Sequence, residues 1–270
     1  MALNNSKSIF VTFGAGRSGW LGAAKRITAE AEKTSLFEFC FNLDEQWLKT
    51  WDPDIYKIGL NLRKNHPPRG FGYWTWKPSV LLWAHLNFPN YQIVYVDAGS
   101  EFLSAGVHLL EKDLKESLHS GGLAFNLPGH PDICWTKKDL LERLRVSDLD
   151  SKTDQVQSGF ICLPMSKQRN SLLTDWRNIA LEQNGFYFTD ETRSISEERF
   201  REHRHDQSTL SCLWKIHGIP HKSDSSLPNR DNSYGLQAKR NNSRLKHDSR
   251  FRNFVKYLYL LGDIVLLRRS

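Results

Sequence analysis

The chain has 270 residues, 39% of them hydrophobic, which is enough to bury a core in one large or two small domains. Lys and Arg number 37 against 30 acidic residues, so the formal charge is +7. This excess favours an anionic partner such as a nucleotide diphosphate, an acidic lipid surface or nucleic acid, and it is equally typical of a solvated basic surface. The four cysteines lack zinc-ligand spacing, and the sequence has neither a secretory signal nor an apolar run of the ~20 residues that a membrane span needs. A cytoplasmic protein is expected.

Strand and helix patterns alternate from the start of the chain. Residues 9–13 are rich in β-formers and predict a strand, which is followed by a Gly-rich turn at 14–16. Apolar residues at helical spacing predict a helix over 21–33, and a second strand is expected at 36–41. This order opens a βαβ unit and predicts an α/β fold with a Rossmann-type mixed sheet flanked by helices.

Pro78 predicts the start of the next helix, which extends to about His85, because proline suits the first helical turn. The strand after it, 91–96 (YQIVYV), ends at Asp97, and open α/β sheets place ligand-binding groups at the carboxyl ends of such strands. The remaining patterns predict helices at 107–118, 137–144, 171–183 and 206–216, and short strands at 123–127 and within 155–163.

The last part of the chain changes composition twice. We expect a catalytic domain over 1–222, followed by a polar linker or mobile loop at 223–250. Residues 251–270 combine apolar residues at helical spacing with basic ones, which predicts an amphipathic tail helix. Such a helix lies either on an anionic membrane surface or against the catalytic domain.

Residues 14–19 (GAGRSG) match the G-x-G-x-x-G fingerprint between a predicted strand and helix, so an NAD(P)-binding oxidoreductase is an alternative. The acidic residue that this fingerprint needs is poorly placed, since Glu38 falls within the second predicted strand and Asp44 beyond it. Trp20 would also crowd the contact between helix and strand. A plain Gly-rich turn explains the pattern better, and a third possibility is that the strand end cradles a nucleoside.

Two further motifs combine charge with a structural boundary. Lys77 follows a glycine- and aromatic-rich segment and precedes a helix, where an ammonium and free helix N–H groups suit a phosphate. The alternative is an aromatic core corner with a lysine whose stem is buried. Asp97 is suited to a divalent ion or to ribose hydroxyls, and its alternative role is to cap a turn.

The segment 203–208 (HRHDQS) places two imidazoles, a guanidinium, a carboxylate and an amide at a predicted helix start. His205 is therefore a candidate for substrate binding. The alternative is that Asp206 is simply an N-cap in a polar loop. A nucleic-acid-binding protein is suggested only by charge and aromatic content, without a recognised binding motif.

Five segments, RGFGYWTWKP, YVDAG, WTKKDLLERL, QVQSGFI and EHRHDQSTLS, occur in this order and spacing. Together they resemble a group of bacterial GT-A-type glycosyltransferases linked to surface polysaccharide (capsule or lipopolysaccharide) synthesis. The resemblance covers residues 10–219. It implies a GT-A-like fold, a nucleotide-sugar donor, a glycan or lipid-linked acceptor, no nucleic acid, and a place at the inner face of the cell membrane.

The resemblance assigns metal and acceptor roles. Asp97 corresponds to the first carboxylate of a DxD-type motif, which holds Mn²⁺ or Mg²⁺ and the nucleotide. Because its third position is Gly99, it stays open whether Glu101 supplies a second carboxylate or the metal is absent. Gln157 and Gly159 correspond to the segment that shapes the acceptor side of the cleft.

The resemblance also suggests where the sugar reacts. Asp206 corresponds to a carboxylate near the anomeric carbon and Gln207 to its neighbour, which orients the sugar; Thr12 and Phe13 correspond to the strand end that contacts the nucleoside. We further expect Lys77 and Arg69 to bind the phosphates. The whole interpretation requires that Lys77, Asp97 and Asp206 meet around one pocket.

Overall fold

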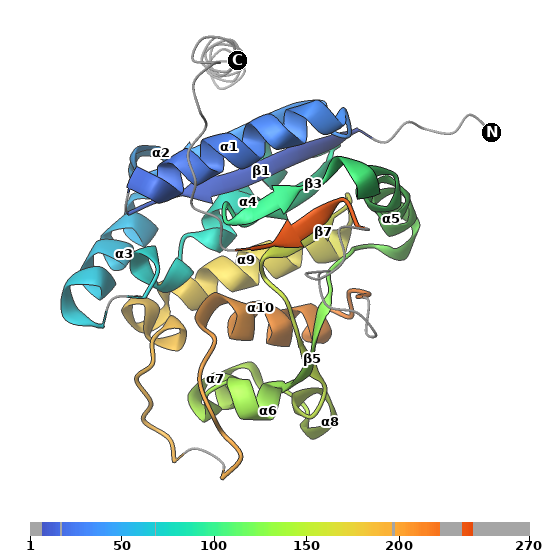
Figure 1. Cartoon of the computed structure of the whole chain (residues 1–270). Coiled ribbons are helices and arrows are strands. Elements are labelled where there is room, and N and C mark those ends of the chain that lie inside the picture. Colours follow the sequence, from blue (N-terminus) through green and yellow to red (C-terminus); the bar gives the residue numbers. More distant parts are fainter. Residues whose placement is uncertain (1–6, 17, 68, 196–197, 222–233, 240–270) are drawn as a thin grey trace, which may run out of the picture.

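The computed structural model describes residues 7–239 apart from 17, 68, 196–197 and 222–233 (Figure 1). The expected tail helix at 251–270 lies outside these residues, as does most of the expected linker. Within the described part, no helix has the length and apolar character needed to cross a bilayer.

A four-stranded mixed sheet forms the centre of the molecule. Its order is β2-β1-β3-β7; β1 is parallel to both β2 and β3, and β7 is antiparallel to β3. The mixed sheet with flanking helices confirms the predicted fold class. The strands are β1 (Ser8–Gly14), β2 (Phe39–Asp44), β3 (Gln92–Val96) and β7 (Phe160–Leu163).

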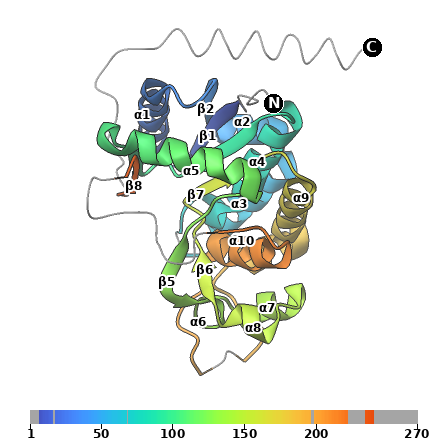
Figure 2. The same cartoon turned by 90° about the vertical axis from the view of Figure 1, so that its right-hand side faces the viewer.

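Both faces of the sheet are covered, which explains the nearly continuous apolar runs in β1 and β3. Because side chains alternate along a strand, Ile9 and Val11 of β1 pack in one hydrophobic cluster and Phe10 in the other. α1 and α5 cover the face of Phe10, and α4 and α9 cover the opposite face (Figures 1 and 2). These helices are α1 (Ser18–Thr34), α4 (Lys77–Asn87), α5 (Val107–Ser120) and α9 (Lys167–Leu181).

Two helices between β2 and α4 were not predicted, and β2 lies three residues later than expected. α2 (Glu45–Trp51) and α3 (Pro53–Asn65) begin at two aspartate caps, Asp44 and Asp52. Each cap accepts a hydrogen bond from the backbone N–H of the third residue after it. Such a cap commonly stabilises a helix by about 1 kcal/mol. These caps and the proline at the start of α3 mark the two helix starts in the sequence, although the apolar periodicity does not indicate these helices.

A second, smaller sheet carries a group of short helices below the main sheet (Figure 2). β5 (Asn126–Pro131) pairs antiparallel with β6 (Asp154–Val156). α6 (Asp132–Trp135), α7 (Lys138–Leu144) and α8 (Asp148–Ser151) surround this pair. α10 (His205–Ile216) packs between this group and α9. Three 3₁₀ segments complete the described elements: η1 (Phe71–Trp74), η2 (Ser104–Gly106) and η3 (Glu182–Phe188).

Part of the segment expected to be a linker is instead a packed strand. β8 (Leu236–Ala238) pairs antiparallel with β4 (Ser100–Phe102). Leu236 is fully buried, and the Tyr234 hydroxyl donates to Asp113 over 2.7 Å. The prediction of a polar linker over 223–250 is therefore wrong for residues 234–239, because a strand-to-strand pairing so distant in sequence leaves no local pattern.

Candidate active site

The site lies where the order of the central sheet reverses. The chain leaves β1 for β2 on one side and later returns through β3 on the other, so the switch point lies at the carboxyl ends of β1 and β3. Open α/β sheets commonly bind ligands at such a point. Asp97 follows β3 directly, Lys77 is the first residue of α4, and Asp206 is the second residue of α10.

These three residues form an ion-paired triad. The Lys77 Nζ atom lies 3.1 Å from Asp97 Oδ1 and 2.6 Å from Asp206 Oδ2. The Lys77 side chain is only 1% exposed, so its charge is compensated by the two carboxylates rather than by water. The structure thus brings together the three groups that the sequence analysis expected to meet.

Neighbouring hydroxyl groups fix the two carboxylates. Tyr95 donates to Asp97 Oδ1 over 2.7 Å, and Ser158 donates to Asp206 Oδ2 over 2.7 Å. Burial acts to lower the pKa of Lys77, but the two carboxylates outweigh it and raise that pKa above its usual value. The triad therefore contains one ammonium and has a net charge of −1 when both acids are ionised.

Asp97 is the more accessible of the two acids. Its side chain is 43% exposed, against 8% for Asp206. A Cβ atom placed on Gly159 would lie 3.2 Å from Asp97 Oδ2, so the glycine leaves room for this oxygen. The backbone N–H of Asp97 also donates to the Gly159 carbonyl over 2.9 Å. Gly159, expected on the acceptor side of the cleft, therefore borders Asp97.

The donor set fits a divalent cation only in part. Asp97 Oδ2 could hold Mn²⁺ or Mg²⁺ together with water and phosphate oxygens, which is how Mg²⁺ is commonly bound at nucleotide sites. Glu101 does not supply a second carboxylate here, because it lies on β4 and pairs with Lys239 at 3.1 Å. Among the described residues, no group of three or more His, Cys, Asp or Glu side chains is arranged to hold a metal.

The two cations expected at the phosphates have other partners. The Lys77 ammonium is engaged by the two acids and by Ser158, so it would have to leave them to reach a phosphate. Arg69 pairs with Asp190 at 3.2 Å and with Glu202 at 3.3 Å. Ion pairs of this kind depend on contacts distant in sequence, which the motifs alone do not reveal.

Thr12 and Phe13, expected to contact the nucleoside, lie beneath the site. The Thr12 hydroxyl is buried and donates to the Val96 carbonyl over 2.7 Å. Phe13 stacks on Trp76 with 4.1 Å between ring centroids. Both side chains therefore support the site from below. Gly99 is also buried, in the turn that follows Asp97.

The two glutamines flank the triad on the side of the smaller sheet. Gln157 donates through Nε2 to the Asn126 carbonyl over 3.1 Å. Gln207 donates through Nε2 to Gln155 Oε1 over 2.7 Å. Both are partly exposed. Gln157 directly precedes Ser158, which contacts the triad, and Gln207 directly follows Asp206. Asp206 is not an N-cap, since its carboxylate is committed to Lys77 and Ser158.

A strained aromatic cluster beside Asp206 was not predicted. Tyr73, Trp74 and His205 all have left-handed backbone conformations, with φ of 54°, 60° and 51°. Their side chains meet: Trp74 stacks on His205 at 5.5 Å, and Tyr73 contacts the same imidazole edge-on at 5.0 Å. Non-glycine residues in this region cost about 1–3 kcal/mol each and cluster at functional sites. The cluster fixes the start of α10, and therefore Asp206.

Two buried histidines, His205 of this cluster and His203 next to it, have lowered pKa values. The His203 Nδ1 accepts from the backbone N–H of Lys137, so its Nε2 donates to the Tyr187 carbonyl over 2.9 Å. Burial, and then the charge of Lys137, lower the pKa of His203 well below its usual value. Burial likewise lowers the pKa of His205. These imidazoles hold backbone carbonyls in place and are not charged partners for a phosphate.

Comparison with known proteins gives only distant matches. No protein-family model matches the chain, and no curated protein matches it. Among solved structures, it is similar to mouse xyloside xylosyltransferase 1 (12% identity, TM-score 0.38, covering 80% of this chain and 84% of the other). It is also similar to the galactosyltransferase LgtC in complex with donor and acceptor sugar analogues (11%, 0.38, 94% and 95%).

A third solved structure is the Mn/GDP form of core-mannan synthase A from Aspergillus fumigatus (10% identity, TM-score 0.37, covering 94% of this chain and 83% of the other). Two of these proteins are named as sugar transferases and the third as a mannan synthase. Similarity at this level establishes neither a shared family nor a shared activity.

The groups of the turn that resembles a dinucleotide fingerprint are already bound to other residues of the protein. β1, α1 and β2 do form a βαβ unit, and β2 ends at Asp44, where the fingerprint requires an acid. The Asp44 carboxylate, however, caps α2. The Gly16 N–H, which a pyrophosphate would need, donates to Glu45 over 2.5 Å. A Cβ atom on Gly14 would lie 2.5 Å from the Trp20 carbonyl, so this glycine serves close packing of α1.

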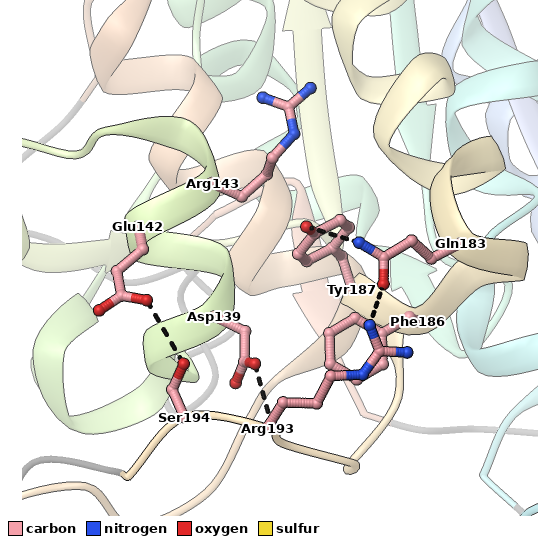
Figure 3. Close-up of a pocket in the computed structure, with 8 residues that line it drawn as sticks. All are labelled: Asp139, Glu142, Arg143, Gln183, Phe186, Tyr187, Arg193 and Ser194. Carbon is pink, nitrogen blue, oxygen red and sulfur yellow. Dashed lines mark hydrogen bonds between the residues drawn. The ribbon is translucent and has the colours of Figure 1, made fainter.

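A pocket is also present away from the triad. It opens between α7, η3 and the segment that follows η3 (Figure 3). None of the triad residues lines it. Its lining residues are Asp139, Glu142, Arg143, Gln183, Phe186, Tyr187, Arg193 and Ser194.

Proposed function

We propose that the protein is a glycosyltransferase that moves a sugar from a nucleotide-diphosphate donor to a glycan or lipid-linked acceptor. The observation that carries this proposal is the meeting of Lys77, Asp97 and Asp206 at the switch point of the sheet. This is the point where open α/β folds commonly bind nucleotides. The five sequence segments support the same activity, since three of them supply the triad.

Asp97 is proposed to face the donor diphosphate. Its exposed Oδ2 would bind Mn²⁺ or Mg²⁺ jointly with the phosphate oxygens. When bound, such a cation neutralises the charge that develops on the departing diphosphate. The chain's own contribution is to aim this carboxylate, which Tyr95 and Lys77 hold by its other oxygen.

Asp206 is proposed to face the anomeric carbon. In the transfer, the bond from this carbon to the phosphate oxygen breaks and its electron pair leaves with the nucleotide, while the acceptor oxygen forms the new bond and its proton is released to solvent. The carbon becomes oxocarbenium-like, so a nearby ionised carboxylate stabilises it. Lys77 and Ser158 hold the Asp206 carboxylate in place, and Gln207 at the next position would hold the sugar.

Finer details rest on the resemblance of the motifs. We propose that the transferred sugar is a hexose and that the product belongs to a bacterial surface polysaccharide. The acceptor would be reached at the cytoplasmic face of the membrane, with residues 251–270 as a peripheral anchor. The basic character of the chain agrees with an anionic membrane surface.

A thermal-shift screen tests the activity class. UDP, GDP and CMP are each added with Mn²⁺, and NAD is added as the alternative ligand. A ligand that binds only the native state at 100 times its Kd stabilises that state by about 2.7 kcal/mol. We expect one nucleotide to raise the melting temperature and NAD to leave it unchanged. A rise with NAD alone would favour the oxidoreductase, and no rise with any of the three nucleotides would contradict the proposal.

A further inference from the structure

The pocket in Figure 3 has the size and position of a separate ligand site. Its volume is about 270 Å³, just below the ~300 Å³ at which pockets for drug-sized ligands begin. A single sugar ring, which is smaller than a drug, suits that space. Tyr187 and Phe186 form its buried wall, and the other lining residues are partly or fully exposed at its mouth.

The charged groups of the lining cancel. Asp139 and Glu142 lie on α7, the lining also includes the guanidinium groups of Arg143 and Arg193, and Arg143 is already paired with Glu182. A phosphate or an acidic sugar gains no net attraction from such a lining. Carboxylate, guanidinium, amide and hydroxyl groups in one ring are suited to the alternating donors and acceptors of a neutral saccharide. In Figure 3 Gln183 lies against Tyr187 and Arg193, and Glu142 against Ser194, whereas the Arg143 guanidinium points away from the other labelled side chains.

One of the two aromatic rings of the lining, that of Phe186, already lies beside two cations. The Lys137 Nζ lies 3.9 Å from the centroid of Phe186, and the Arg193 Cζ lies 4.1 Å from it. Both cations therefore compete with any ligand for the Phe186 ring, and Tyr187, the second aromatic residue of the lining, is buried. A ligand here would rely mainly on hydrogen bonds.

Backbone strain holds one lining group in place. Gln183 and Asn184 are both left-handed, with φ of 49° and 57°, before Gly185 at 82°. Only Gln183 of these three lines the pocket. Its amide donates to the Tyr187 hydroxyl over 3.2 Å and accepts from Arg193. Strain kept at a side chain that faces a cavity is typical of a functional position.

The pocket is joined to the active site by a single segment. The Lys137 ammonium donates to the carbonyls of Phe186, Thr189 and Glu191, at 2.6 to 3.1 Å, and fixes the chain as it leaves the pocket. Asp190, within this stretch, lies 3.8 Å from His205, the residue before Asp206. A glycan bound at the triad on the side of α10 could therefore extend toward the pocket.

We propose that this pocket binds a neutral sugar unit of the acceptor glycan, away from the hydroxyl that reacts. The inference rests on the proposed glycosyltransferase activity for the identity of the glycan. Its own evidence is the lining: two carboxylates with two guanidinium groups, a Phe186 ring that lies beside two cations, and a Gln183 amide held by strain next to the Tyr187 hydroxyl.

Saturation-transfer NMR on the full chain tests this with four neutral probes: the methyl glycosides of glucose, galactose, mannose and xylose. Gln183→Gly removes the amide and relieves the strain, so it is not expected to lower the melting temperature. Asn184→Gly relieves the same strain at the next position but leaves the lining intact, and it is the matched control. We expect at least one probe to bind the wild type and the control, and to bind Gln183→Gly about fivefold more weakly, as the loss of one hydrogen bond predicts.

Asp206→Asn separates this pocket from the triad. Signal that persists in Asp206→Asn and falls in Gln183→Gly supports the proposal. Signal that falls only in Asp206→Asn would overturn it, because the sugar would then bind at the triad alone, and the glycosyltransferase proposal would stand. Absence of binding by all four probes would also overturn it. The nucleotide screen judges the activity class independently of these outcomes.

Discussion

Lys77 holds two acids from different parts of the chain at one point. Its burial means that the pair contacts are not screened by water, and removing one partner of such a buried pair commonly costs about 3–5 kcal/mol. The same contacts exclude it from the phosphates in this structure. Lys77 is therefore best described as a positioning residue, and the chemistry rests with the carboxylates that it orients.

Asp206→Asn tests the role of the carboxylate near the sugar. Asparagine keeps the shape and can still accept from Ser158, while Asp97 remains as a counter-ion for Lys77. Loss of the negative charge should reduce the rate of sugar transfer by roughly 10²–10⁴-fold, the range typical of a catalytic acid–base or electrostatic group. Rates are measured with the donor identified by the nucleotide screen, and melting temperature serves as the folding control. Full activity in a folded variant would remove Asp206 from catalysis.

Gly159→Ala tests whether Asp97 must keep its present position. The added Cβ would lie 3.2 Å from Asp97 Oδ2, so the carboxylate must shift by a few tenths of an ångström. Such a shift should weaken donor binding, because the geometry at a reacting centre tolerates little displacement. We expect the Kd for the nucleotide to rise by about tenfold with the melting temperature nearly unchanged. An unchanged Kd would show that Asp97 is not a donor contact.

The segment from η3 to the start of α10 connects the pocket with the triad, and Lys137 is its main internal contact. Burial lowers the pKa of Lys137 to about 8, so it is still mostly charged at neutral pH. Its ammonium donates to three carbonyls of this segment. Three carbonyl groups would lose this donor together if the residue were replaced by methionine.

Lys137→Met should therefore speed hydrogen exchange over residues 186–206 while leaving β1 and β3 unchanged. Lys138→Met is the control, because Lys138 is more exposed and its ion pair with Glu142 is long, at 3.9 Å. Exchange is followed by mass spectrometry on both variants. Equal exchange of this segment in the two proteins would contradict the role given to Lys137.

Elements with local signals were predictable from the sequence. The apolar runs of β1 and β3 and the periodicity of α1, α5 and α10 each predicted an element close to its observed place. The pairing of β4 with β8 was not predicted, because its partners are distant in sequence. α2 and α3 were missed although Asp44 and Asp52 were available as caps.

For the site, the sequence predicted which acids would meet but not how. Asp97 and Asp206 were chosen from motif order, and the structure joins them through Lys77. The pairing of Lys77 depends on burial, which only the fold decides. The left-handed conformations of Tyr73 and Trp74 were also unpredictable, because non-glycine residues carry no local code for them.

The stability of the whole molecule should depend on pH through its buried histidines. The pKa values of His203 and His205 are lowered from 6.5 in the folded state, mainly by burial. Below pH 6.5 the unfolded chain therefore binds more protons than the folded one, and stability falls as pH falls. Each histidine contributes a slope of at most about 1.4 kcal/mol per pH unit.

Melting temperatures measured from pH 8 to pH 5 test this. We expect a plateau above about pH 7 and a decline below it, in keeping with the ordinary histidine pKa. His203→Gln, which keeps a donor for the Tyr187 carbonyl, should make the decline shallower. An identical decline in the variant would show that His203 does not carry the effect.

The proposed activity depends on Asp97 and its neighbours being the nucleotide site. Titration calorimetry of UDP or GDP with Mn²⁺, whichever nucleotide stabilises the protein, compares the wild type with Asp97→Asn. We predict that the Kd rises by about 10–100-fold in the variant, since it loses the charged contact to the cation and diphosphate. Equal affinity in the two folded proteins would contradict the central claim.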